Sequence, residues 1–391
     1  MKKVFSILLA LVLCLGLVSV SAEGKVNLVV WESTNGPDQW IQKAGEAFTA
    51  LHPNITIEYV NVELGDSSGQ IALDGPAGIG PDLFAAPHDK LGELVSGGHV
   101  AQVPNPDEIK ALVLGGCANA VTYDGVMYGY PTSSETYALY YNKDIVPTPP
   151  ATWEELVKFC ESYNAANPGK YGFMMDVTSA YYTILFTTSG ANRLFGESGT
   201  DVTSTYLNSE EAIKGMTFFQ SLRKILDAPS ADLTTALCDA AFKDGTAAMH
   251  ISGPWNITPF TEAKVNFGVA AIPALPGETT PPATFSGTRG MFISAYSEHQ
   301  TEAAQFAQFL LTPEMQSLRF DITGAMPSTS IKVESPYMEG FLAQMQYAFP
   351  MPSIPQMGKF WDATGAASQN IWNGSDVKTE LDAANAAILA Q

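Results

Sequence analysis

Two tryptophans follow short runs in which proline interrupts the chain. Trp255 ends the run SGPW (252–255), directly after an apolar segment, and Trp361 follows the proline-rich run PSIPQM (352–357). Proline fixes φ and lacks an N–H, so a helix is expected to begin just after Pro355 and to carry Trp361 in an early turn. A flat ring held at such a place can stack on an apolar ligand face, and burial in a helix face is the alternative.

Two carboxylates, Asp89 in APHDKLGELV and Glu135 in YPTSSETYALYY, offer a second chemistry. A pair of carboxyl groups about 5 to 9 Å apart, with one pKa raised by apolar surroundings, is the arrangement of a glycoside hydrolase. The rest of the chain does not support catalysis, because it has no G-x-S-x-G motif and no cysteine beside a histidine. We therefore expect no catalytic residue and a protein that is not an enzyme.

The five histidines do not have the spacing of a metal site. The sequence has no HExxH or CxxC pattern, and His88-Asp89 is a single pair of ligand types. A metal carrier is therefore disfavoured. Neither a metal ion nor a cofactor is expected.

The first 22 residues, MKKVFSILLALVLCLGLVSVSA, have the pattern of a secretory signal peptide. Two lysines precede an apolar run too short to span a bilayer comfortably, and small residues end it where the leader would be cut. The mature chain is expected to begin near Glu23 and to be released into the periplasm. A form acylated at Cys14 is disfavoured, because Leu13 precedes this cysteine where a small residue is usual.

Size, charge and cysteine content narrow the class of the mature protein. Without its leader the 391-residue chain keeps 369 residues, so two domains are expected. Its formal charge of −20 becomes −22, because the leader holds two lysines and no acids. The electrostatic field of this negative charge repels phosphate backbones and anionic lipids, which makes nucleic acid and membrane surfaces poor candidates for partners. Cys117, Cys160 and Cys238 leave two options open, one bridge with a free thiol or three buried thiols.

The elements that must position these residues alternate between strand and helix. The apolar run 26–31 is typical of a buried strand, 39–51 has helical spacing, 55–62 alternates like a second strand, and 81–87 is a short strand leading into a loop. This β-α-β order predicts a mainly parallel sheet with helices on both faces. Ligands of such sheets bind beyond the carboxyl ends of the strands, so the loops after Trp31 and Phe84 are candidate sites.

Helix and strand signals alternate again in the second half of the chain. Thr152 and Glu155 form a capping box at the start of one helix, and 209–226 is amphipathic. The run 275–287 is a linker rich in proline and glycine, followed by an apolar strand at 290–297. These signals predict a second α/β domain.

Several of these segments together resemble a known family. LVVWE, PDLFAAPHDK, VMYGYPTSSETYALYYNKDIVPTPPATWEEL, AAFKDGTAAMHISGPWN, VNFGVAAIPALPG and PSIPQMGKFWDA occur in the order and spacing of the extracellular solute-binding proteins of carbohydrate ABC importers. Within that family the chain looks most like the maltose and maltodextrin binders. The resemblance covers nearly the whole mature chain, and the combination of motifs in one chain is more specific than any single motif.

The resemblance implies a two-lobed periplasmic-binding-protein fold, with a hinge between two mainly parallel, doubly wound sheets and interleaved chain crossings. The crossings are expected near 133–136, 284–287 and 328–335. One lobe would combine 23–133 with 285–329, and the other 134–284 with 330–391. The implied function is that of a monomer that closes on an oligosaccharide, most of all an α-glucan of the maltodextrin type, and delivers it to the transmembrane subunits of an ABC permease.

The resemblance also implies the aromatic part of a sugar site. A pyranose has faces of C–H groups that stack on aromatic rings, and hydroxyls that bond to charged or amide groups around the ring. Trp255, Trp361 and Tyr181 match stacking residues of the maltodextrin binders, and Tyr182 lies beside Tyr181.

The polar part of the implied site is acidic. Asp89 and Glu135 match carboxylates that accept hydrogen bonds from sugar hydroxyls, and Lys90 and Arg289 are expected to pair with these acids and to bond the sugar. The structural alternatives are a helix N-cap for Asp89, a hinge ion pair for Glu135 and exposed pairing for Lys90. The first loop would add hydroxyl partners, which are Glu32, Ser33 and Asn35.

The chain also departs from the maltodextrin binders. Ala86 and Ile184 stand where tryptophans are usual, Asn35-Gly36 replaces an aspartate-lysine pair, and Ser179 replaces an acid. Fewer rings and acids imply a changed set of subsites. The alternatives to an α-glucan are therefore a different sugar, or a polyamine held by acids and aromatic walls.

Overall fold

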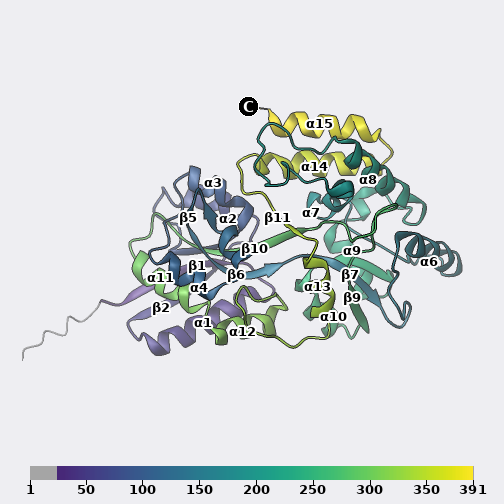
Figure 1. Cartoon of the computed structure of the whole chain (residues 1–391). Helices are drawn as coiled ribbons and strands as arrows, with labels where there is room; N and C mark the ends of the chain where they lie inside the picture. Colours follow the sequence, from purple (N-terminus) through teal and green to yellow (C-terminus); the bar gives the residue numbers. More distant parts are fainter. Residues whose placement is uncertain (1–23, 391) are drawn as a thin grey trace, which may run out of the picture.

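The computed structural model describes residues 24–390, so the predicted leader at 1–22 lies outside the described residues. Buried apolar side chains form two hydrophobic cores. The first draws on residues 28–130 and 291–315 and defines the first lobe, and the second draws on 137–285 and 326–388 and defines the second lobe. Figure 1 shows the two lobes side by side, with β6 and β10 running between them.

The first lobe is built on a mixed sheet. Its elements are β1 (Val26–Glu32), α1 (Pro37–Leu51), β2 (Ile55–Asn61), α2 (Ser67–Asp74), β3 (Leu83–Pro87), η1 (His88–Lys90), α3 (Leu91–Ser96), α4 (Pro106–Leu112), α5 (Gly115–Ala120), β4 (Thr122–Tyr123), β5 (Val126–Met127), β6 (Gly129–Glu135), β10 (Phe285–Ile293), α11 (Gln300–Phe309) and α12 (Pro313–Thr323).

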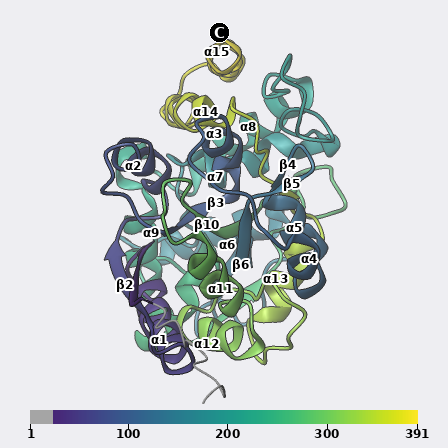
Figure 2. The ribbon, with the colours of Figure 1, turned by 90° about the vertical axis from the view of Figure 1, so that its left-hand side faces the viewer.

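The strand order of this sheet is β11-β10-β3-β1-β2, with β6 also paired to β10; β11 (Phe349–Pro350) joins this sheet from the later part of the chain. The predicted β-α-β unit is present, because β1 pairs in parallel with both β2 and β3. Strand β10 runs antiparallel to β3 and β6. Figure 2 looks onto this lobe and shows β2 towards one side and α5 beside β6 towards the other.

The second lobe holds a smaller sheet and more helices. Its elements are β7 (Ala138–Asn142), α6 (Trp153–Ala166), α7 (Ala180–Thr183), η2 (Ile184–Ala191), α8 (Glu210–Ser221), η3 (Leu222–Lys224), η4 (Ser230–Asp232), α9 (Thr235–Lys243), β8 (Met249–Ser252), η5 (Pro254–Asn256), α10 (Ile257–Glu262), β9 (Phe267–Ala270), α13 (Met338–Met345), β11 (Phe349–Pro350), α14 (Met357–Trp372) and α15 (Val377–Leu389).

The expectation of two mainly parallel sheets is wrong for the second lobe. Strand β7 lies between β8 and β9 and is antiparallel to both. Only two residues separate β6 from β7, so β7 enters the second sheet directly from the other lobe. Without a crossover helix before it, nothing forces this strand to run parallel to its neighbours.

The strands that connect the lobes are held together where they cross. Thr136 Oγ1 donates to the carbonyl of Phe285 at 2.8 Å and lies 2.7 Å from Thr284 Oγ1. The N–H of Ser134 donates to the carbonyl of Met326 at 2.9 Å, which joins a further crossing segment. Hydrogen bonds therefore join the three segments at which the chain passes between the two cores.

Local sequence signals account for several helix starts and for the state of the thiols. Thr152 caps α6 by accepting the N–H of Glu155 at 3.2 Å, as the capping box predicts. Helix α14 begins at Met357, two residues after Pro355. The three described cysteines are buried and unpaired, which decides between the two options in favour of three buried thiols.

Candidate functional site

Two predicted site residues from opposite lobes meet directly. Asp89 lies in η1, at the carboxyl end of β3, and is only 4% exposed. Trp361 lies in the second turn of α14 and is half-buried. The indole Nε1 of Trp361 donates to Asp89 Oδ2 at 3.2 Å. The bond therefore joins the first lobe to the second. It lies at the carboxyl ends of the strands of the first sheet, where ligands of such sheets bind.

Aromatic rings continue from Trp361 through the second lobe. The ring centroid of Phe285 lies 5.9 Å from that of Trp361 and 6.2 Å from that of Tyr181. Tyr181 lies 6.3 Å from Trp255. The three predicted stacking residues thus form one cluster around Phe285, which sequence reasoning did not select because it stands inside the proline-rich run taken as a linker.

The hydroxyl of Tyr181 is buried and has no hydrogen-bond partner within residues 24–390. Burial raises the pKa of Tyr181 well above its ordinary value, and the negative charges of Glu135 and Asp89 raise this pKa further. The phenol is therefore a neutral donor close to two carboxylates. An O–H in this position is free to donate to a ligand oxygen.

Both carboxylates near this phenol are harder to ionise than usual. Burial raises the pKa of Asp89 to about 6, against the opposing effects of Lys90 and of the bond from Trp361. Burial also raises the pKa of Glu135, which ends β6, while Arg289 and Arg319 act in the opposite direction. When ionised, each group is an acceptor in a partly dry environment, where hydrogen bonds are stronger.

Three further predicted residues bond to one another. The Arg289 guanidinium contacts the Glu32 carboxylate through two nitrogens, with Nε donating to Oε2 at 3.2 Å, and also donates to the hydroxyl of Ser33. All three residues are buried in the first lobe. This bidentate ion pair joins the end of β1 to β10.

Arg319, which sequence reasoning missed, lies beside this ion pair. It is 2% exposed, its guanidinium lies 4.5 Å from the ring centroid of Trp40, and its Nη2 donates to Ser133 Oγ at 3.2 Å. Nε and Nη1 have no partner in the described part of the chain, and burial lowers the pKa of Arg319 to about 10. Met315, Arg319 and Thr323 recur every four residues on one buried face of α12, and this spacing could have indicated that Arg319 faces the core.

Three predicted residues remain, and one of them, Tyr182, adjoins the cluster, with its ring centroid 5.3 Å from that of Tyr181. Lys90 Nζ lies 3.6 Å from Glu93 Oε2 in an ordinary surface pair. Asn35 is exposed, in a left-handed turn with φ 63°. Tyr182 is buried in the second core, with its ring centroid 5.2 Å from that of Tyr137.

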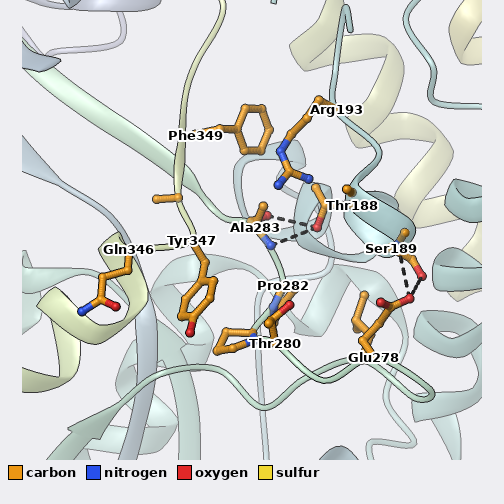
Figure 3. Close-up of a pocket in the computed structure, with 15 residues that line it drawn as sticks. Thr188, Ser189, Arg193, Glu278, Thr280, Pro282, Ala283, Gln346, Tyr347 and Phe349 are labelled. Atoms are coloured by element: carbon orange, nitrogen blue, oxygen red, sulfur yellow. Dashed lines mark hydrogen bonds between the residues drawn. The ribbon is translucent and has the colours of Figure 1, made fainter. Parts of the chain in front are cut away.

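The second lobe also contains a cavity that is separate from the cluster. It has a volume of about 270 Å³, and Figure 3 shows Arg193, Phe349 and Glu278 around it. The Arg193 guanidinium lies 5.5 Å from the Phe349 ring centroid, and Glu278 accepts from Ser189 Oγ at 2.8 Å. Residues of the ring cluster do not line this cavity, so we do not assign the ligand site to it.

Rings with acidic groups at their edges can bind a neutral polyhydroxylated ligand. Residues 24–390 contain no group of three or more His, Cys, Asp or Glu side chains arranged to hold a metal ion. No helix in the same range is long and apolar enough to cross a membrane.

Comparison with known proteins decides the family. A family model of bacterial extracellular solute-binding proteins matches residues 43–336. The chain belongs to this family. Its members bind solutes, so this solute-binding protein is not an enzyme, as predicted.

Relatives of this solute-binding protein match it over nearly its full length. It is 30% identical to a maltodextrin-binding protein of Bacillus subtilis, over 99% of this chain and 96% of that protein. It is 28% identical to a galactooligosaccharide-binding protein of the same organism, over 91% of this chain and 87% of that one.

Solved structures give the same result for the fold. The maltotriose-binding protein of Thermus thermophilus, bound with maltotriose, superposes with a TM-score of 0.85 at 29% identity, covering 93% of this chain and 99% of that one. A cyclo/maltodextrin-binding protein complexed with maltotetraose gives 0.80 at 33% identity, covering 94% and 97%. The solute-binding protein therefore has the expected periplasmic-binding-protein fold.

Proposed function

We propose that this protein is the substrate-binding component of an ABC importer, that it captures a maltodextrin-type oligosaccharide between its lobes, and that it delivers this ligand to the transmembrane subunits of a permease. The observation that carries the proposal is the meeting of Asp89 and Trp361 across the lobes, beside the Tyr181 hydroxyl. The names of the relatives at about 30% identity support a glucan as the ligand.

In this proposal the rings and the acids have separate tasks. Trp255, Tyr181 and Trp361 stack on C–H faces of the sugar, and Asp89 and Glu135 accept bonds from its hydroxyls. Glu32, Ser33 and Arg289 have a supporting role, since their polar groups already bond to each other. Lys90, Asn35 and Tyr182 then have at most peripheral roles.

Capture requires the lobes to move. We take 23–133 with 285–329 and 134–284 with 330–391 as the moving units, joined by the hydrogen-bonded hinge around Thr136 and Thr284. A ligand that touches both lobes only in the closed form shifts the equilibrium towards closure. The protein acts as a monomer outside the cytoplasmic membrane, released after cleavage of the leader.

A galactooligosaccharide is the second candidate ligand, because one relative at 28% identity is named for it. The departures at Ala86 and Ile184 bear little on this choice, since both side chains are fully buried and face their cores. A polyamine is the third candidate, favoured only by the acidic charge.

A titration panel tests the proposal. Tryptophan fluorescence is followed while maltotriose, a galactooligosaccharide, sucrose or spermidine is added to the mature protein. We expect a saturable change with maltotriose and none with spermidine. Saturation by spermidine, with no response to any glycan, would reject the carbohydrate class, and a response to the galactooligosaccharide alone would correct the sugar.

A further inference from the structure

His88, the residue before Asp89, makes two hydrogen bonds in the interior of the protein. It is 1% exposed. Its Nδ1 lies 3.1 Å from the backbone N–H of Thr288, and its Nε2 lies 3.1 Å from the carbonyl oxygen of Met351. A backbone N–H can only donate and a carbonyl can only accept, so Nδ1 is the bare nitrogen and Nε2 carries the proton. The two bonds fix one neutral tautomer.

One of these two bonds, that to Met351, connects the lobes. His88 follows β3, and Thr288 is in β10 of the same sheet, whereas the side chain of Met351 packs in the core of the second lobe. Met351 begins the stretch between β11 and α14. The imidazole therefore ties this stretch to the first lobe.

The segment 349–356, from β11 to the residue before α14, lies against the first lobe at other points as well. Phe349 pairs with Phe285 at the start of β10, where the chain passes between the lobes, and the N–H of Met351 donates to the carbonyl of Ser286, the next residue of β10, at 3.2 Å. Helix α3 approaches the segment so closely that a Cβ on Gly92 would lie 2.2 Å from the carbonyl oxygen of Ser353. Only glycine fits there without a shift of the backbone.

This segment leads directly into the part of α14 that carries Trp361. His88 holds Met351, and Asp89 bonds to Trp361 ten residues further along the chain. Two consecutive residues of η1 are thus attached to both ends of one short stretch. A rotation or shift of the segment at Met351 would move Trp361 relative to Asp89.

We propose that His88 is a positioning residue for the ligand site: by fastening segment 349–356 to the first lobe, it determines where Trp361 stands relative to Asp89. The ligand part of this inference rests on the proposed function, and the part about Trp361 does not. Burial lowers the pKa of His88 to about 4, so the neutral ring keeps both bonds at ordinary pH.

Two substitutions of His88 distinguish the effects of its two hydrogen bonds. In His88→Asn the side-chain oxygen can replace Nδ1 as acceptor for Thr288, but the amide is too short to reach Met351. In His88→Gln the longer amide can replace Nε2 as donor to Met351, so the bond between the lobes is kept. His99→Asn is the matched control, because the ring of His99 bonds to Tyr296 within the first lobe.

The first readout needs no sugar. The indole N–H resonance of Trp361 is followed by NMR in the ligand-free protein and assigned with Trp361→Phe. We expect His88→Asn to shift this resonance towards the value of a free indole, and His88→Gln and His99→Asn to leave it near the wild-type value. Equal shifts in both His88 variants, or no shift in His88→Asn, would overturn the proposal.

The second readout is maltotriose affinity. We expect it to fall about tenfold in His88→Asn and less than threefold in His88→Gln. If His88→Asn shifts the resonance but the wild-type protein binds no glycan, the positioning role stands and the proposed function fails. Should the His88 variants not fold, Gly92→Ala tests the same point, because its Cβ pushes on Ser353 and leaves His88 intact. An unchanged Trp361 resonance in that variant would count against the proposal.

Discussion

The indole of Trp361 and the buried carboxylate of Asp89 lie in different lobes and are joined by a hydrogen bond of 3.2 Å. The bond uses Oδ2 of Asp89, so the other carboxylate oxygen keeps its capacity to accept from a ligand. The stacking ring and the acid that we assign to the ligand are therefore in direct contact with each other.

Trp361→Phe tests the importance of this bond, because phenylalanine keeps a ring but has no N–H. The bond lowers the pKa of Asp89, so its loss is expected to raise that pKa above about 6. We expect maltotriose affinity at pH 7 to fall about tenfold, measured by calorimetry. A variant with wild-type affinity would show that the N–H is not needed.

Asp89 gives stability and affinity opposite dependences on pH. Its folded pKa of about 6 is above its ordinary value of 3.8, so the folded state holds more protons between these pH values, and stability falls as pH rises through this range. The expected loss is of the order of 3 kcal/mol. Sugar affinity is expected to rise over the same interval, because the ionised group is the better acceptor.

Asp89→Asn is the control for both pH profiles. Urea unfolding and maltotriose titration from pH 4 to pH 8 are expected to become flatter in this variant. If the profiles of Asp89→Asn match those of the wild type, another group is responsible.

Tyr181→Phe removes a buried hydroxyl that has no partner in the described residues. An unsatisfied buried hydroxyl costs about 1–3 kcal/mol, so we expect the ligand-free variant to be at least as stable as the wild type. Its maltotriose affinity is expected to fall, because the ligand loses a donor. A combination of lower stability and unchanged affinity would mean that the hydroxyl has an internal role.

Trp255→Ala removes a ring from the other end of the cluster. We expect a loss of about 1–3 kcal/mol in binding free energy, which is typical of a central aromatic contact. Phe285→Leu is a useful comparison, since Phe285 is buried between the rings. An affinity unchanged by Trp255→Ala would exclude this ring as a contact.

Arg289→Met leaves Glu32 as a buried charge without its partner. Removing one member of a buried pair costs about 3–5 kcal/mol, so the midpoint of urea unfolding is expected to fall clearly. Arg289→Met combined with Glu32→Leu is expected to recover most of this loss, because neither charge of the pair is then left buried without the other. Equal unfolding midpoints for the single and the double variant would contradict this account of the pair.

The parts of the fold that depend on neighbours in sequence were predictable. Proline at 352 and 355 marked the start of α14, Thr152 and Glu155 marked the start of α6, and the spacing of apolar residues marked the β1-α1-β2 unit. The direction of β7 was not predictable in this way. It depends on the chain passing from one lobe to the other, which leaves no periodic trace in the sequence.

The residues of the site also divide into those that the sequence could predict and those that it could not. Residue type and family resemblance selected Asp89, Tyr181, Trp255 and Trp361, which the fold brings together, but not Phe285 or Arg319. Their contacts join residues more than 100 positions apart: Phe285 packs on Tyr181, and Arg319 bonds to Ser133. Local spacing on α12 could have shown that Arg319 faces the core, but it carries no information on which distant residue either side chain contacts.

The state of the thiols has a practical consequence. Cys117, Cys160 and Cys238 are buried and unpaired, and burial raises the pKa of each, so little thiolate is present to attack a maleimide. A dye can therefore be attached to one engineered surface cysteine on each lobe without deleting the native ones. Energy transfer between the two dyes would then report closure optically, and the protein could serve as a reagentless sensor for its ligand.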